Sequence, residues 1–500
     1  MGTRQIGAIL ADGTTALVAT AAAAAACATV WWLGSLLAGG ATAGVTSAAV
    51  LATVVALSLG RRTFASRTEF ARSAVVLPFI GLVAGGVGWL LVVAPPVGAA
   101  LFVTGMSVPI WLRRFGPRLS RLGALVALPF TAMLIAPVSP VSGQPGWITT
   151  LLVLLAGVIA TVWVAVAREI LRLLPGRRQE AAPADPPPFA ARGAAAGSGR
   201  ARLPASTRMA IQLAVALTAA FLLGWLLFPE HAMWVVLTAF LVCSGNRGRG
   251  DVVHKSALRV VGALAGTIAA VALTAAAPHA SGFGGVVIIF VALFVGTWLR
   301  AYSYAFWALT VTLVLTLLQQ LTGTASLTGE TGMLAERMLA IVLGAALGIA
   351  ASWFVLPVRS IDVLRRRLSE LLTTVGAAIA VPSEDEEERT RAVAAVRASA
   401  ARVEQLAPAH RARRLLRRPG RGVGPAGTSP AVLPIDCIDA AAELPGALDE
   451  HLSRRGPEDA DHVLRAVKRA RASLASPPEL ARVRAALVAL AAALRASPAP

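Results

Sequence analysis

The feature that most constrains this chain is a series of apolar runs, each close to the roughly 20 residues that a helix needs to cross the hydrocarbon core of a bilayer. Hydrophobic residues make up 56% of the sequence and the mean hydropathy is +0.70, whereas soluble domains are about 45 to 50% apolar. The sequence therefore predicts an all-α, polytopic integral membrane protein with about twelve transmembrane helices. The predicted spans are 15–38, 41–60, 73–93, 94–112, 122–138, 147–167, 207–228, 230–245, 257–278, 282–299, 302–321 and 333–357.

Arginine-rich connections alternate with connections that carry no basic residue. In the first half of the chain, four arginines follow each of the second, fourth and sixth spans, whereas the connections at 39–40, 95–96 and 139–146 contain none. Basic residues are retained on the cytoplasmic side of a membrane. We therefore expect a multi-pass protein of the cell membrane whose N-terminus (residues 1–14), arginine connections and C-terminus are cytoplasmic.

The apolar runs fall into two groups of six. Residues 15–167 form the first predicted membrane half and residues 207–357 the second. Between them, residues 168–206 are rich in Pro, Gly and Ala without apolar periodicity, which predicts a flexible cytoplasmic linker. Residues 358–500 return to the polar, amphipathic pattern of soluble helices and predict a cytosolic helical domain. Two halves of the same orientation suggest a parallel repeat of six helices, as in some transporter folds.

Pairs of glycines spaced four residues apart recur within the predicted spans. This spacing lets two membrane helices approach closely. The pairs predicted to pack helices in this way are Gly81 and Gly85, Gly262 and Gly266, and Gly344 and Gly348.

The candidate binding residues are cations and aromatic side chains on the second group of spans. The central parts of the predicted spans contain no Asp, Glu, Lys or Arg, so we expect Arg259 at the inner mouth and Arg337 at the outer mouth of a site or pore for an organic anion. The alternative is that both arginines are interfacial anchors. Trp234, Tyr304 and Trp307 form either a stacking wall for a planar ligand or an interfacial belt.

Gln319 lies on a predicted span and faces either a cavity or a neighbouring helix. It completes the set of candidate substrate-binding residues.

No pattern of residues indicates catalysis, a metal site or a cofactor. The sequence has no phosphate-binding G-x-x-x-x-G-K-[ST] loop and no H-E-x-x-H, and its three cysteines are far apart. The net charge of +20 is distributed over short connections, so we do not expect nucleic acid as a partner. The expected partners are the lipid bilayer and a small organic anion, and the many small-residue helix faces would allow a homo-oligomer.

The second half carries a set of motifs that is similar to a known family. It resembles the fusaric acid resistance and aromatic acid exporter superfamily. The shared motifs are an apolar helix with a Trp, a basic turn, the pattern Arg-x-x-Gly-x-x-x-Gly, and a helix that ends at Pro and contains an Arg seven residues before a Gly. In this sequence the matching residues are Trp234, the turn 247–255, Arg259, Gly262, Gly266, Arg337, Gly344 and Pro357. In the first half, Pro78 stands where the aligned arginine would be.

The resemblance implies a membrane transporter that exports aromatic carboxylic acids or similar toxic compounds, driven by an ion gradient. Two other hypotheses remain open. One is a passive organic-anion channel, which the lack of a carboxylate within the predicted spans favours. The other is a membrane scaffold whose cytosolic domain binds a partner. None of the three is an enzyme.

Overall fold

The computed structural model of the protein is almost entirely helical in the residues that it describes. These are 3–37, 42–62, 64, 67–135, 146–173, 203–245, 247–276, 282–321, 331–381, 385–416, 432–454, 460–475 and 479–496. Most of the predicted linker at 168–206 therefore lies outside the described residues. The contacts divide the chain into a membrane unit (Met1–Gln179, Leu203–Asn246 and Lys255–Leu356) and a C-terminal unit (Glu180–Arg202, Arg247–His254 and Pro357–Pro500).

The membrane unit contains the apolar helices in the predicted order. The first group consists of α1 (Thr3–Leu37), α2 (Thr42–Gly60), α3 (Arg67–Val93), α4 (Pro95–Leu112), α5 (Pro117–Ile135) and α6 (Gly146–Leu173). The second group consists of α8 (Ala205–Leu227), α9 (Ala232–Cys243), α10 (Arg249–Ala276), α11 (Phe283–Leu299), α12 (Tyr304–Leu321) and α13 (Thr331–Phe354).

Eight helices in the described part of the chain are long and apolar enough to cross a membrane. The prediction of an all-α, polytopic membrane protein is therefore confirmed. Four further apolar stretches, Gly44–Gly60, Leu125–Leu134, Pro229–Cys243 and Phe283–Leu299, are shorter.

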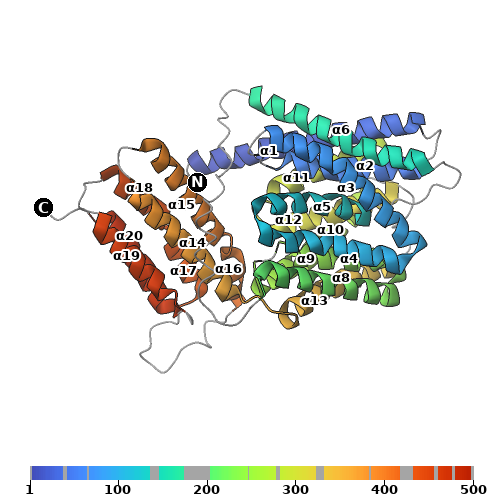
Figure 1. Cartoon of the computed structure of the whole chain (residues 1–500). Helices are drawn as coiled ribbons and strands as arrows, with labels where there is room; N and C mark the ends of the chain where they lie inside the picture. The colour runs from blue at the N-terminus through green and yellow to red at the C-terminus, as the bar shows by residue number, and fades with distance from the viewer. Residues whose placement is uncertain are drawn as a thin grey trace. The chain divides into compact units, whose positions relative to one another are not determined.

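Helix α9 lies beside α8 and α13 (Figure 1). Ten of its residues are buried, including Trp234 and Thr238, and it packs between α8 and α13. It follows the 3₁₀ turn η2 (Pro229–His231) and stops before Gly245, whose φ of 67° favours glycine. A helix of 12 residues is about 18 Å long, which is less than the roughly 30 Å hydrocarbon core. Helix α9 is therefore a short and largely buried helix.

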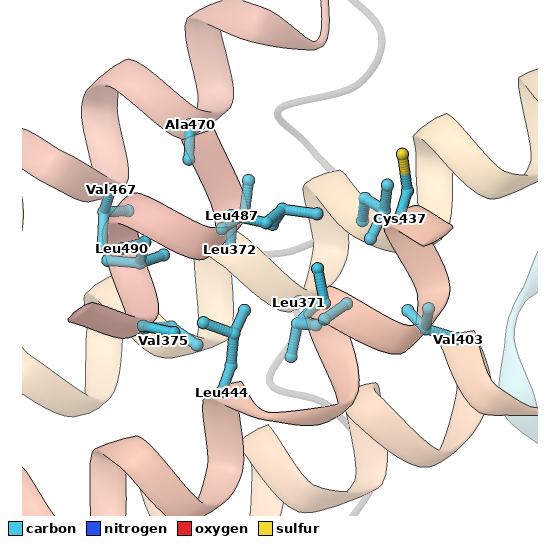
Figure 2. Packing of buried hydrophobic residues seen from close by; sticks show 14 of the residues in the cluster. Leu371, Leu372, Val375, Val403, Cys437, Leu444, Val467, Ala470, Leu487 and Leu490 are labelled. Carbon is cyan, nitrogen blue, oxygen red and sulfur yellow. The ribbon is translucent and has the colours of Figure 1, made fainter. Parts of the chain in front are cut away.

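The C-terminal unit is a second helical assembly with its own core. It consists of α14 (Ser360–Ala380), α15 (Glu386–Glu404), α16 (Ala407–Leu416), α17 (Pro434–Ala442), α18 (Leu444–Arg454), α19 (Ala460–Ser473) and α20 (Leu480–Arg495). Figure 2 shows Leu371 and Val375 of α14 facing Leu444, Leu487 and Leu490 from later helices.

Local sequence signals explain how these polar helices start. Asp385 caps α15, because its Oδ1 accepts a hydrogen bond of 2.8 Å from the Glu388 amide. Glu386, Glu387 and Glu388 then occupy the first turn, where acidic side chains complement the helix dipole.

The start of α10 is bound within the C-terminal unit. The Arg249 amide donates to the Val358 carbonyl at 3.3 Å, and the Gly250 amide donates to Ser360 Oγ at 3.2 Å. Helix α10 begins at Arg249, eight residues before the predicted span. Arg259 therefore lies well within the length of α10 and not at its N-terminal end.

Candidate functional site

Two arginines are buried in the membrane unit and meet at one residue of α12. Arg259 is 0% exposed and Arg337 is 4% exposed. Arg259 Nη1 donates to the Ala308 carbonyl and to Thr312 Oγ1, both at 3.3 Å. Arg337 Nη2 donates to the Thr312 carbonyl at 3.2 Å. Both guanidinium groups therefore lie beside the middle of α12.

The prediction that Arg259 and Arg337 stand at opposite mouths is wrong. Arg259 is the eleventh residue of α10 and Arg337 is the seventh of α13, so each lies more than a helical turn from the start of its helix. Their long side chains then reach the same turn of α12. Charged groups within a membrane are costly and mark functional sites by default.

Glycines let α10 approach α12. A Cβ on Gly262 would lie 2.6 Å from both the Ala305 carbonyl oxygen and Ala308 Cβ, which is closer than side-chain atoms can come. A Cβ on Gly266 would meet the Leu309 carbonyl oxygen and lie 3.0 Å from Thr312 Cβ. The close contact holds Arg259, on the preceding turn of α10, against the carbonyl and hydroxyl groups of α12.

A second pair of glycines lets α13 approach α9. A Cβ on Gly344 would meet the Val235 carbonyl oxygen and lie 2.9 Å from Thr238 Cβ. A Cβ on Gly348 would lie 2.9 Å from Val242 Cγ1. This contact brings Arg337 of α13 over Trp234 of α9.

The glycine pair in the first half of the chain, Gly81 and Gly85, does not bring two helices close together. The prediction of close helix packing at this pair is wrong. A Cβ on Gly81 or Gly85 would meet only Val153, at 3.8 to 3.9 Å, which is an ordinary van der Waals distance. Both glycines instead line a small apolar cavity with Pro129 and Met133.

Trp234 and Gln319 complete the surroundings of Arg337. Arg337 Cζ lies 3.8 Å from the centroid of the Trp234 ring, a cation–π geometry. Arg337 Nη1 lies 3.5 Å from Gln319 Oε1, which accepts its hydrogen bond. Two of the candidate residues thus contact the same arginine.

Tyr304 lies near Arg259 and Arg300, whereas Trp307 contacts Arg300. Tyr304, Ala308 and Thr312 are spaced by four residues and so share one face of α12. The Tyr304 hydroxyl is buried, has no hydrogen-bond partner among the described residues and interacts electrostatically with Arg259. Trp307 instead stacks on Arg300, whose Cζ lies 5.1 Å from the ring centroid.

The arginine pair has positive charge without a matching negative charge. Among the described residues, no ion pair joins either arginine to a carboxylate, and Arg259 Nε, Arg259 Nη2 and Arg337 Nε are buried without a hydrogen-bond partner. The two guanidinium groups also repel each other. A buried charge without a partner costs several kcal/mol, about the penalty of its desolvation. An anion with several acceptor oxygens would satisfy these donors.

Two contributors lie outside the set of candidate substrate-binding residues. Thr312 bonds both arginines, and its position eight residues after Tyr304 on the same face of α12 was the signal that could have found it. His231 is 8% exposed, and its Nδ1 lies 3.6 Å from Glu336 Oε2. It lies three residues before Trp234, and Glu336 lies directly before Arg337.

The side chains that commonly bind metal ions do not cluster in the described part of the chain. In the ranges that the structure describes, no group of three or more His, Cys, Asp or Glu could hold one.

The comparisons with known proteins address the second half of the membrane unit. Residues 215–351 match the family model described as fusaric acid resistance protein-like. The match includes Trp234, Arg259, Thr312 and Arg337, and it confirms the resemblance for this segment. The search of curated proteins finds no match.

Proposed function

We infer that this chain, whose residues 215–351 are similar to the fusaric acid resistance protein-like family, is a membrane transporter whose arginine pair binds organic anions. The observation that carries this inference is the burial of Arg259 and Arg337 without a carboxylate partner among the described residues. Guanidinium groups bind carboxylates through charge-assisted, often bidentate hydrogen bonds. The unpartnered nitrogens supply such donors at the middle of α12.

The surrounding residues favour aromatic carboxylic acids as the substrate class, as does the resemblance. Trp234 and Tyr304 place aromatic surface beside the two cations. A substrate with one carboxylate and one ring would satisfy the donors and pack on this surface. Toxic compounds of the same chemistry would be exported by the same site.

The proposed architecture is two six-helix halves in one orientation, with the N-terminus and the C-terminal unit in the cytosol. Contacts between the halves support it, because α4 packs on α8 and α1 packs on α11. Each contact joins the first helix of one group to the fourth of the other, as a parallel repeat about a two-fold axis requires. The arginine-rich connections support the orientation in a cell membrane.

A passive channel for the same anions is the second candidate function. Among the described residues, no ion pair joins either arginine to a carboxylate, which favours it. A channel would pass the anion without proton coupling, so a protonophore would leave its flux unchanged at zero membrane potential.

Replacing Arg337 tests the proposed site directly. In liposomes that contain the purified protein, we expect Arg337→Ala to reduce the flux of labelled benzoate about 10- to 100-fold. The reason is that a hydrogen bond to a charged group contributes about 1.5 to 3 kcal/mol. The measurement is the initial rate of benzoate release at equal protein density.

The matched control is Arg114→Ala. Arg114 also belongs to the membrane unit, but its guanidinium stacks on Trp111 and Phe115, at 4.7 and 4.5 Å from the ring centroids. This variant should keep the rate of the unmodified protein. The same rates are measured for a panel of aromatic carboxylates. If the Arg337 variant and the unmodified protein release all of them equally fast, the proposed function loses its basis.

A further inference from the structure

The pair formed by His231 and Glu336 lies beside the arginine pair but is not part of it. His231 Nδ1 is buried, lacks a hydrogen-bond partner among the described residues and lies 3.6 Å from Glu336 Oε2. The His231 side chain is 10% exposed, whereas that of Glu336 is 59% exposed. The carboxylate therefore connects a buried imidazole to water.

The backbone links this pair to both sides of the Arg337–Trp234 contact. His231 is the N-cap of α9, and Trp234 follows it by three residues, which places the two on neighbouring positions of one helix face. Glu336 and Arg337 are consecutive on α13. His231 therefore contacts the residue next to Arg337 and shares a helix with the aromatic ring on which Arg337 stacks.

The charged groups around His231 are few. From α13 come Glu336 and Arg337, and from its own turn comes Glu230, which is exposed. The described part of α8 contains one ionisable residue, Arg208, at the opposite end of that helix, and α9 contains no Asp, Glu, Lys, Arg or His. The N-terminal end of α9 adds partial positive charge. Among these described elements, Glu336 is the acidic residue whose carboxylate lies beside the His231 imidazole, where it can stabilise the protonated form.

We propose that His231 is a proton-binding residue whose protonation strengthens anion binding at the arginine pair. Histidine is the side chain that most readily gains or loses a proton near neutral pH. The proton comes from water by way of the exposed Glu336 carboxylate, binds His231 Nδ1 and returns to water by the same route, and no other bond changes. This proposal rests on the proposed function, because it needs an anion at Arg337.

The sign of the coupling follows from the charges. With His231 neutral, the negative charge of Glu336 acts on an anion at Arg337 without compensation and weakens its binding. With His231 protonated, the imidazolium neutralises Glu336, and the anion binds more tightly. By thermodynamic reciprocity, a bound anion makes His231 hold its proton more tightly by the same factor.

The test is the affinity of the full-length purified protein for benzoate between pH 5.5 and 8.5, measured by calorimetry. Benzenesulfonate, which stays ionised throughout, serves as a parallel probe so that ionisation of the ligand does not imitate the effect. We expect the dissociation constant of both probes to rise about tenfold from the acidic to the alkaline end, within the usual range for coupled sites. His231→Gln should bind both probes with no dependence on pH.

Two further variants show whether the pH dependence comes from the His231–Glu336 pair. Glu336→Gln removes the charge that protonation compensates, so it should bind tightly across the whole range. His462→Gln changes an exposed histidine of α19 and should keep the tenfold change.

The outcomes distinguish this proposal from the proposed function. If His231→Gln keeps the pH dependence, or if the unmodified protein binds equally at every pH, then the proton-binding role is refuted while the anion site stands. If neither probe binds at any pH, both ideas fail together. A looser fold would also differ, because it would weaken binding in the His231 variant below the affinity that the unmodified protein has at the alkaline end.

Discussion

Replacing Arg259 by methionine is expected to abolish anion transport and, at the same time, to raise the thermal stability of the protein. The side chain is fully buried, and two of its three nitrogens have no hydrogen-bond partner among the described residues. Exchanging buried charged groups for apolar ones of similar volume often stabilises a protein by about 1 to 4 kcal/mol. Methionine fits because it is long, unbranched and tolerant of irregular space.

The two effects are measured on one preparation. Thermal unfolding in detergent without substrate should show a higher Tm for Arg259→Met than for the unmodified protein. Adding benzoate should raise the Tm of the unmodified protein, because a ligand that binds only the folded state stabilises it, and should leave the variant unchanged. A lower Tm with full transport would show that Arg259 is a structural residue and not a binding residue.

Replacing Gly262 by alanine is expected to reduce both stability and anion binding. The new methyl group would lie 2.6 Å from the Ala305 carbonyl oxygen and from Ala308 Cβ, so α10 and α12 would have to separate. Overpacking of this kind costs about 1 to 3 kcal/mol. Separation also draws Arg259 away from Ala308 and Thr312, so we expect benzoate affinity to fall about tenfold.

The matched control is Gly86→Ala on α3. A Cβ at Gly86 would meet no atom within 4 Å, and alanine is favoured over glycine inside a helix by about 0.5 to 1 kcal/mol. This variant should be at least as stable as the unmodified protein. Unchanged stability and affinity in the Gly262 variant would mean that the helices adjust, and that close approach does not position Arg259.

Much of the fold was predictable from the sequence because a membrane reduces the possibilities. Apolar runs of spanning length can hardly form anything except helices, since lipid offers no partner for backbone groups. The amphipathic pattern of residues 358–500 likewise predicted a helical domain, in which Val396 and Val403 of α15 are buried. The ends of the helices were harder to predict. Residues Arg249 to Ser256 are polar enough to resemble a loop, but they form the first turns of α10.

The site was predictable in its residue types but not in its geometry. Arg259, Arg337, Trp234, Tyr304 and Gln319 were all candidates, yet their distances depend on how α9, α10, α12 and α13 pack. Hydropathy places an arginine near a span end at the mouth, because its side chain can reach water. Only three-dimensional packing shows that Arg259 and Arg337 both turn inward to Thr312.

The meeting of two arginines at Thr312 also bears on what the protein must keep out. Sodium, potassium and hydronium ions approaching the middle of α12 would meet two positive charges, and no carboxylate there lowers their energy in the described structure. Fixed charges of one sign reject ions of the same sign in narrow membrane passages. In the proposed transporter, the two arginines that bind the anion would therefore also keep the leak of small cations across the membrane low.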